Sequence, residues 1–222
     1  MSLQANGISV TAERDSDTAY GLLLERIVNL SISPGALINE QLLASELDYG
    51  RTPVREALAR LAADRFVTIL PRRGIIVTPV TFEDVLAMFE ARETIECGVA
   101  YIAATRVTQE DLDEIRKLVA ATETARISGS SEEFLLADLA VHTFLVHMIK
   151  NPILQEAAER LLAHNLRFWR IYWRDRPVQL DAMHSHAPLI EAIEANDSGA
   201  AEEAMRQHLR ESGELVQLLF VR

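Results

Sequence analysis

Histidine and aspartate side chains in the second half of the chain have the types and spacing needed to bind a metal ion. Asp138 and His142 are four residues apart, so on a helix both side chains project from one face. His186 and His208 fall on the last two predicted helices, which a connection near residues 197–199 would bring together. One carboxylate and three neutral imidazoles suit a divalent cation, with zinc first and nickel, manganese or iron as alternatives. The residues alone leave open a second interpretation, in which these are ordinary core or surface histidines.

We do not assign the remaining histidines, or the aromatic residues near position 170, to the metal site. We interpret His184 as a neighbour of the site rather than a ligand, and His147 and His164 as structural. Trp169, Tyr172 and Trp173 are expected to fill a core or an interface.

Arginines in the first half have a spacing that suits nucleic acid. Arg51 and Arg55 lie one helical turn apart and therefore share a face, and a guanidinium can bind a guanine edge or a phosphate through two hydrogen bonds. The alternative is that arginines here only solvate a helix or form surface ion pairs, which contribute little stability. We favour that alternative for Arg60 and Arg65, and DNA contact for Arg51 and Arg55.

The segment around these arginines has the pattern of a winged helix-turn-helix. Helical periodicity over residues 18–30 is followed by a short helix that Asn39 caps and that runs to residue 47, and then by a third helix from about Thr52-Pro53 to residue 64. Two β-rich runs, 67–70 and 75–78, flank a turn that contains glycine and predict a hairpin. In this arrangement the last helix enters the major groove of DNA.

From residue 81 onward the pattern is helical throughout. Capping residues such as Thr81, three before Asp84, mark several helix starts. The predicted helices are Thr81–Thr105, Thr108–Ser128, Ser131–Ile149, Pro152–Arg174, Gln179–Asn196 and Ser198–Phe220. We therefore expect a mainly α protein with two domains: residues 1–80 as a winged helix-turn-helix of three helices and a hairpin wing, and residues 81–222 as an all-helical bundle.

Composition and charge are compatible with this division. The chain has 222 residues and a net charge of −11, which argues at first against nucleic acid. However, residues 1–80 hold 8 Arg against 9 Asp and Glu, so nearly all the negative charge lies in the second half. The lone Cys97 excludes an internal disulfide, and we find no secretory signal and no apolar run long enough to cross a membrane. These features predict a cytoplasmic protein.

Three runs in the first half, Glu40–Ala44, Arg51–Leu61 and Pro71–Gly74, resemble the GntR family of transcriptional regulators. The resemblance covers about residues 18–80. It implies that the start of the recognition helix and the tip of the wing contact DNA. The residues implicated are Arg51, Thr52, Arg55, Arg72, Arg73 and Gly74, with Gln41 on the preceding helix. Gln41 stands where several relatives carry Arg, and Asp48-Tyr49-Gly50 replaces the family's usual Gly-Val-Ser or Gly-Val-Thr, so the operator preference cannot be transferred.

The second half is similar to the FCD effector domain of the FadR-type branch over about residues 82–215. The runs that carry this likeness are Phe89–Glu96, Asp138 with His142, Asn151-Pro152, His186–Ile193 and Met205–Leu209. Many such domains hold a metal through one Asp and three His, and all four positions are filled here. The resemblance also implies that Arg92 faces the cavity and pairs with an effector carboxylate. The alternative for Arg92 is an ion pair within its own helix with Glu96, four residues on.

Together these features predict a homodimeric DNA-binding regulator. We expect it to be a repressor, because repression is the commoner behaviour in the family that it resembles. It would bind a pseudo-palindromic operator in double-stranded DNA, and a small organic acid bound at the metal and Arg92 would modulate that binding. Three alternatives stay open: a metal-dependent enzyme, a regulator that responds to the metal alone, and an adaptor that does not bind DNA.

Overall fold

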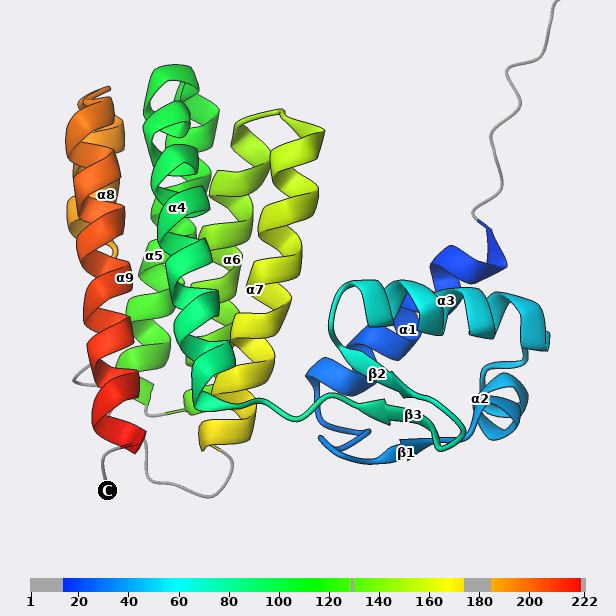
Figure 1. Cartoon of the computed structure of the whole chain (residues 1–222). Helices are drawn as coiled ribbons and strands as arrows, with labels where there is room; N and C mark the ends of the chain where they lie inside the picture. The colour runs from blue at the N-terminus through cyan, green and yellow to red at the C-terminus, as the bar shows by residue number, and fades with distance from the viewer. Residues whose placement is uncertain (1–13, 129, 174–184, 221–222) are drawn as a thin grey trace, which may run out of the picture. The chain divides into compact units, whose positions relative to one another are not determined.

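The computed structural model describes residues 14–128, 130–173 and 185–220 (Figure 1). Among the described residues, contacts within the chain group 14–27 and Ser31–Thr78 into one compact unit, and Val28–Leu30 and those from Pro79 onward into a second. The first unit is a small helical domain with a sheet, and the described elements of the second unit are all helices. The predicted mainly α fold class is confirmed. Within the described ranges, no helix is both long and apolar enough to cross a bilayer.

In the first unit, helices pack over a small antiparallel sheet whose strand order is β1-β3-β2. Ala57, Leu61 and Phe66 are fully buried in its core. The elements are α1 (Asp15–Val28), β1 (Leu37–Ile38), α2 (Glu40–Leu47), α3 (Arg51–Ala63), β2 (Val67–Leu70) and β3 (Gly74–Val77).

Local chemistry explains where these helices begin and end. The side chain of Asn39 accepts hydrogen bonds from the backbone of Gln41 and Leu42, which confirms it as the cap of α2. Asp48 then adopts a left-handed conformation (φ 56°) that ends α2. The first helix ends at Val28, two residues earlier than predicted, because Leu30 is also left-handed (φ 63°) and cannot continue a helix.

The hairpin matches the sequence prediction closely. Leu70 pairs with Gly74, so residues 71–73 form the turn. Arg72 in this turn (φ 63°) and Gly74 at the start of β3 (φ 101°) both have positive φ. A Cβ at Gly74 would lie 3.3 Å from Leu37, so this position favours glycine both by conformation and by space. The sequence analysis missed β1, which pairs with β3 through only two residues, too short a run to show any periodicity.

The second unit is an array of helices in which α4 contacts α6, α7, α8 and α9 (Figure 1). The predicted capping box at Thr81 and Asp84 is present at its first helix. Val141, Leu145 and Ile149 are fully buried in the core. The helices are α4 (Phe82–Arg106), α5 (Gln109–Ser128), α6 (Ser131–Met148), α7 (Pro152–Trp173), α8 (Ala187–Glu194) and α9 (Ser198–Phe220).

The fifth predicted helix of this unit, Gln179–Asn196, is shorter than expected. Residues 179–184, His184 among them, lie outside the described residues. Within the described part α8 begins only at Ala187, with His186 as its N-cap and a proline in its first turn. It ends at Glu194, since Asn196 is left-handed (φ 52°). His186 therefore precedes the helix instead of lying within it.

Replacing Leu145 with alanine should destabilise the second unit by about 2–5 kcal/mol, because the change leaves a cavity in a packed core. Leu145 is fully buried, whereas Leu136 on the same helix is 46% exposed. Leu136→Ala should therefore cost about 1 kcal/mol or less. Both tryptophans of the chain, Trp169 and Trp173, lie in α7, so urea unfolding followed by tryptophan fluorescence reports on this unit. Equal losses in the two variants would contradict the described packing.

Candidate metal centre and nucleic-acid interface

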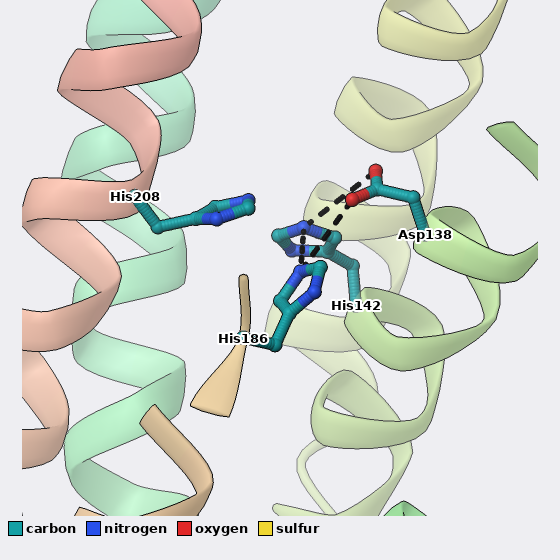
Figure 2. A group of neighbouring side chains, drawn as sticks. All are labelled: Asp138, His142, His186 and His208. Carbon is teal, nitrogen blue, oxygen red and sulfur yellow. Dashed lines mark hydrogen bonds and ion pairs between the residues drawn. The ribbon is translucent and has the colours of Figure 1, made fainter. Parts of the chain in front are cut away.

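Four side chains that could hold a metal converge inside the second unit. Asp138 and His142 come from α6, His186 from the residue before α8, and His208 from α9 (Figure 2). One donor atom from each residue lies within 4.8 Å of the others. The three histidines are buried, and Asp138 is partly exposed. The structure thus brings together all four residues that the sequence analysis proposed as ligands.

Nitrogen and oxygen atoms face one another across this cluster. The Nε2 atoms of His142 and His186 are 3.3 Å apart, and Asp138 carboxylate oxygens lie 3.5 Å from His186 Nε2 and 3.8 Å from His142 Nε2 (Figure 2). The ring of His208 lies 4.3 Å from that of His186, between centroids. Two nitrogens bound to one tetrahedral zinc at about 2.05 Å would be separated by roughly 3.3 Å. The separation observed is therefore compatible with both nitrogens binding one ion.

The protonation of His186 also suits a ligand. Burial lowers the pKa of His186 to about 4, with Asp138 opposing this shift and the charges near His142 and Arg92 adding to it. The imidazole is therefore neutral at pH 7 and keeps the lone pair that a metal requires. Its Nδ1 is buried and has no hydrogen-bond partner among the residues that the structure describes. A buried, neutral imidazole that has a ring nitrogen without a hydrogen bond and lies beside a carboxylate fits a site for a cation. The four side chains are therefore suitable ligands for a divalent metal ion.

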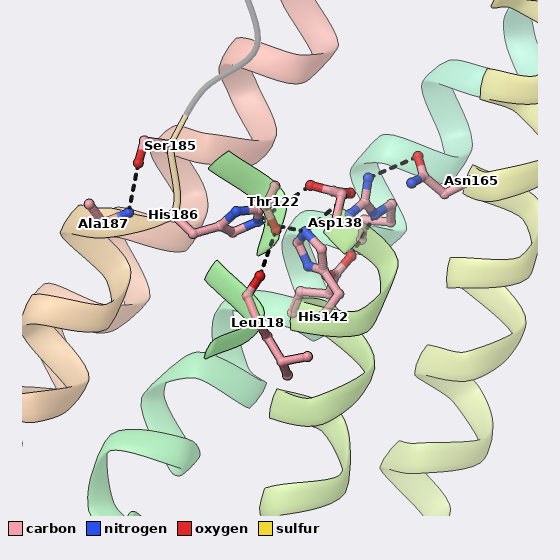
Figure 3. A network of polar contacts seen from close by, with 10 residues as sticks. Leu118, Thr122, Asp138, His142, Asn165, Ser185, His186 and Ala187 are labelled. Atoms are coloured by element: carbon pink, nitrogen blue, oxygen red, sulfur yellow. Dashed lines mark hydrogen bonds and ion pairs between the residues drawn. The ribbon is translucent and has the colours of Figure 1, made fainter. Parts of the chain in front are cut away.

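A second layer of polar groups surrounds His142. Its Nδ1 lies 2.5 Å from Glu96 Oε2, and Arg92 Nε donates to the other oxygen of Glu96, also at 2.5 Å. Arg92 Nη1 donates to Asn165 Oδ1 at 2.9 Å, which links α4 to α7. Figure 3 shows Asn165 joined to this network, on the far side of His142 and Asp138 from His186. Both members of the Arg92–Glu96 pair are 2% exposed.

Glu96 is ionised despite its burial. Burial by itself raises the pKa of this carboxyl, but the charge of Arg92 and the hydrogen bonds from Arg92 and His142 outweigh it and lower the pKa to about 2. The pairing of Arg92 with Glu96 was one of the two interpretations of Arg92, and it is present. Sequence reasoning missed the contacts of Glu96 with His142 and of Arg92 with Asn165, because these partners lie 46 and 73 residues apart.

Exposed side chains at the start of α3 form the candidate nucleic-acid interface. Arg51 and Thr52 occupy its first turn and are exposed, and the Arg55 side chain is 72% exposed. The Nε of Arg55 donates to Glu40 at 3.2 Å, and this contact connects α3 with the start of α2. Gln41 is exposed beside Glu40. The backbone N–H groups at the start of a helix add partial positive charge that favours phosphate.

The tip of the hairpin carries the remaining residues proposed to contact DNA. Arg72, Arg73 and Gly74 are all exposed at this turn. Arg60, by contrast, donates to Asp17 at 2.5 Å and lies over the ring of Tyr20, which supports the structural role favoured for it. The contact of Arg72, Arg73 and Gly74 with DNA is a prediction from the family resemblance.

Comparisons with known proteins agree with both halves of the chain. Residues 15–77 match the family described as bacterial regulatory proteins, gntR family, and residues 87–211 match the FCD domain. The HTH-type transcriptional repressor GlaR of Escherichia coli is 31% identical, with 86% of this chain and 90% of GlaR covered. The HTH-type transcriptional repressor RspR of the same organism is 28% identical, with 89% and 86% covered.

Solved structures extend this agreement to the fold. E. coli McbR/YncC matches with a TM-score of 0.77 at 20% identity, over 94% of this chain and 98% of that one. A putative GntR regulator from Rhodococcus sp. RHA1 matches with a TM-score of 0.71 at 20% identity, over 91% and 97%. These relatives are transcriptional regulators and not enzymes. The chain belongs to the GntR family of DNA-binding transcriptional regulators and carries an FCD domain as its second half.

Proposed function

We propose that this regulator is a homodimeric repressor whose affinity for its operator is modulated by a small carboxylate bound at a metal centre in the second unit. The observation that carries the proposal is the convergence of Asp138, His142, His186 and His208 inside that unit. Repression is proposed because relatives such as GlaR and RspR are repressors. The proposal locates the protein in the cytoplasm, where a bacterial regulator meets its DNA.

In this proposal, the exposed face of α3 and the tip of the hairpin contact the operator DNA. Arg51, Thr52 and Arg55 would contact the major groove, and the turn that bears Arg72, Arg73 and Gly74 would reach the minor groove, with Gln41 beside the backbone. Each protomer would bind half of a pseudo-palindrome, since a two-fold symmetric dimer presents two equivalent recognition helices. The ion pair with Glu40 would hold Arg55 in place until DNA replaces it.

Asp138, His142, His186 and His208 would hold the divalent cation. Zinc is our first choice, and nickel, manganese and iron are alternatives, because neutral imidazole binds all four. When bound, the ion supplies positive charge that attracts an anionic oxygen. Asp138 is the most exposed of the four residues, so the effector would approach from its side.

Arg92 would provide the second contact for the effector's carboxylate. Its Nε is held by Glu96 and one N–H of its Nη1 by Asn165, so one route to this contact is for Nη1 to exchange the oxygen of Asn165 for the carboxylate. Such an exchange would connect ligand binding to the packing of α4 against α7. A ligand changes DNA affinity only if it binds one arrangement of the dimer more tightly than the other, and that difference sets the size of the response.

Arg55→Ala should weaken operator binding by about 1–3 kcal/mol, because it removes a guanidinium from the recognition helix. The measurement is fluorescence anisotropy with a duplex from the regulator's own upstream DNA, at several fixed salt concentrations. If Arg55 contacts a phosphate, the slope of log K against log salt should also fall by about 0.9. Arg116→Ala is the matched control, because it removes the same charge from an exposed ion pair of the second unit. Wild-type affinity in the Arg55 variant would rule out its assigned role.

His186→Ala should lower the affinity for Zn²⁺ by more than the roughly 100-fold seen when second-layer partners of metal ligands are removed. Calorimetric titration of the purified protein with Zn²⁺ measures this. His147→Ala is the control, since His147 is 55% exposed and pairs with Glu159 on the surface. Equal affinities in both variants would argue against the proposed ligand set.

The same proteins distinguish an organic effector from the metal alone as the signal. In the DNA-binding assay, wild type loaded with Zn²⁺ is titrated with gluconate and with succinate as carboxylate probes. A response to a carboxylate that His186→Ala abolishes supports the proposal. A change of operator affinity on Zn²⁺ addition alone would instead support a metal-responsive regulator.

A further inference from the structure

Glu96 lies between two groups with different hydrogen-bonding capacity. One of its oxygens accepts a hydrogen bond from Arg92 Nε, and the other lies 2.5 Å from His142 Nδ1. All three side chains are almost completely buried. A carboxylate can only accept hydrogen bonds, and a guanidinium can only donate them. The proton in the contact between Glu96 and His142 therefore belongs to His142 Nδ1.

We propose that Glu96 is a positioning residue of the candidate metal centre: it holds the proton of His142 on Nδ1 and thereby leaves the lone pair of Nε2 directed at Asp138 and His186. This inference rests on the proposed metal site, but it assigns a role to a residue outside the four candidate ligands. A neutral imidazole has one protonated and one unprotonated nitrogen, so fixing one of them determines the other. Ligand histidines whose second nitrogen is held by a carboxylate are oriented and made more basic.

Arg92 and Asn165 complete this arrangement. Asn165 Oδ1 accepts from Arg92 Nη1, so the guanidinium is held at two points and faces Glu96 in one orientation. Its charge also keeps the buried carboxylate ionised, because an unpaired buried charge is unfavourable. The chain of contacts therefore runs from α7 through α4 to α6, and it ends at a nitrogen of the candidate centre.

The substitution Glu96→Gln should reverse the direction of the hydrogen bond between residue 96 and His142 Nδ1. An amide replaces one of the two carboxylate oxygens with an NH₂ group, which can only donate. Arg92 also only donates, so it must retain the remaining oxygen, and the NH₂ group must face His142. Its donation to Nδ1 would move the imidazole proton to Nε2, the nitrogen that a metal needs free. The variant is nearly identical in shape to the wild type, but it also removes the charge that pairs with the buried Arg92, so its folding is checked separately.

Two measurements test this on the full-length protein. NMR of metal-free protein labelled with ¹⁵N-histidine identifies the protonated nitrogen of each ring, with His142 assigned by the signals that His142→Gln removes. We expect His142 to be protonated at Nδ1 in the wild type and at Nε2 in Glu96→Gln. Calorimetry with Zn²⁺ alone should show affinity about 10–100-fold lower in Glu96→Gln. Circular dichroism checks that the variant is folded.

The control is Glu93→Gln, which removes the same charge from the same helix. Glu93 pairs with Arg206 and Arg210 and is not one of the four residues of the candidate centre. This variant should keep both the His142 tautomer and the Zn²⁺ affinity of the wild type.

The outcomes separate this inference from the proposed function. A wild-type His142 protonated at Nε2 would overturn the role of Glu96, and this readout does not depend on the folding of any variant. Normal Zn²⁺ affinity in folded Glu96→Gln, together with a loss in His186→Ala, would also overturn it while leaving the metal site intact. If wild type binds no Zn²⁺, the metal proposal fails and with it the positioning role, even where the tautomer is as expected.

Discussion

The burial of the Glu96 carboxylate constrains how the helices of the second unit can pack. A buried charge is tolerated only when hydrogen-bond donors surround it, and Arg92 and His142 are those donors. Arg92 shares α4 with Glu96, whereas His142 belongs to α6 and Asn165, the partner of Arg92, to α7. Satisfying this one group therefore requires a specific rotation of three helices about their axes. With that rotation set, His142 faces the histidines supplied from the start of α8 and from α9.

The two candidate sites place their polar residues in opposite environments, for a physical reason. A small cation must be enclosed by several donors, and burial keeps the imidazole of His186 neutral and available. DNA is a large charged surface, so arginines that contact it must stay exposed, as Arg55 does. The DNA-reading residues therefore depend on one helix and one turn, whereas the metal centre depends on the packing of the whole second unit.

Local chemistry accounts for the parts of the fold that sequence reasoning predicted well. Asn39 caps α2, and Thr81 with Asp84 forms the capping box of α4, because caps act within one turn of helix. The hairpin also followed from residues that lie close together in the chain. The two-residue strand β1 and the late start of α8 were missed or wrongly bounded. The boundary of β1 depends on pairing with the distant strand β3, and α8 begins only after His186, which lacks a side-chain capping hydrogen bond that the sequence would reveal.

The sequence by itself determined the GntR and FCD halves of this regulator, the order of its helices and the four candidate ligands of the metal centre. Each of these follows from residue types at short, regular spacings. Only the tertiary structure decided that Glu96 contacts His142 and that Asn165 holds Arg92, since these partners are 46 and 73 residues apart. Periodicity specifies which face of a helix is buried, but not which side chain of another helix meets it there.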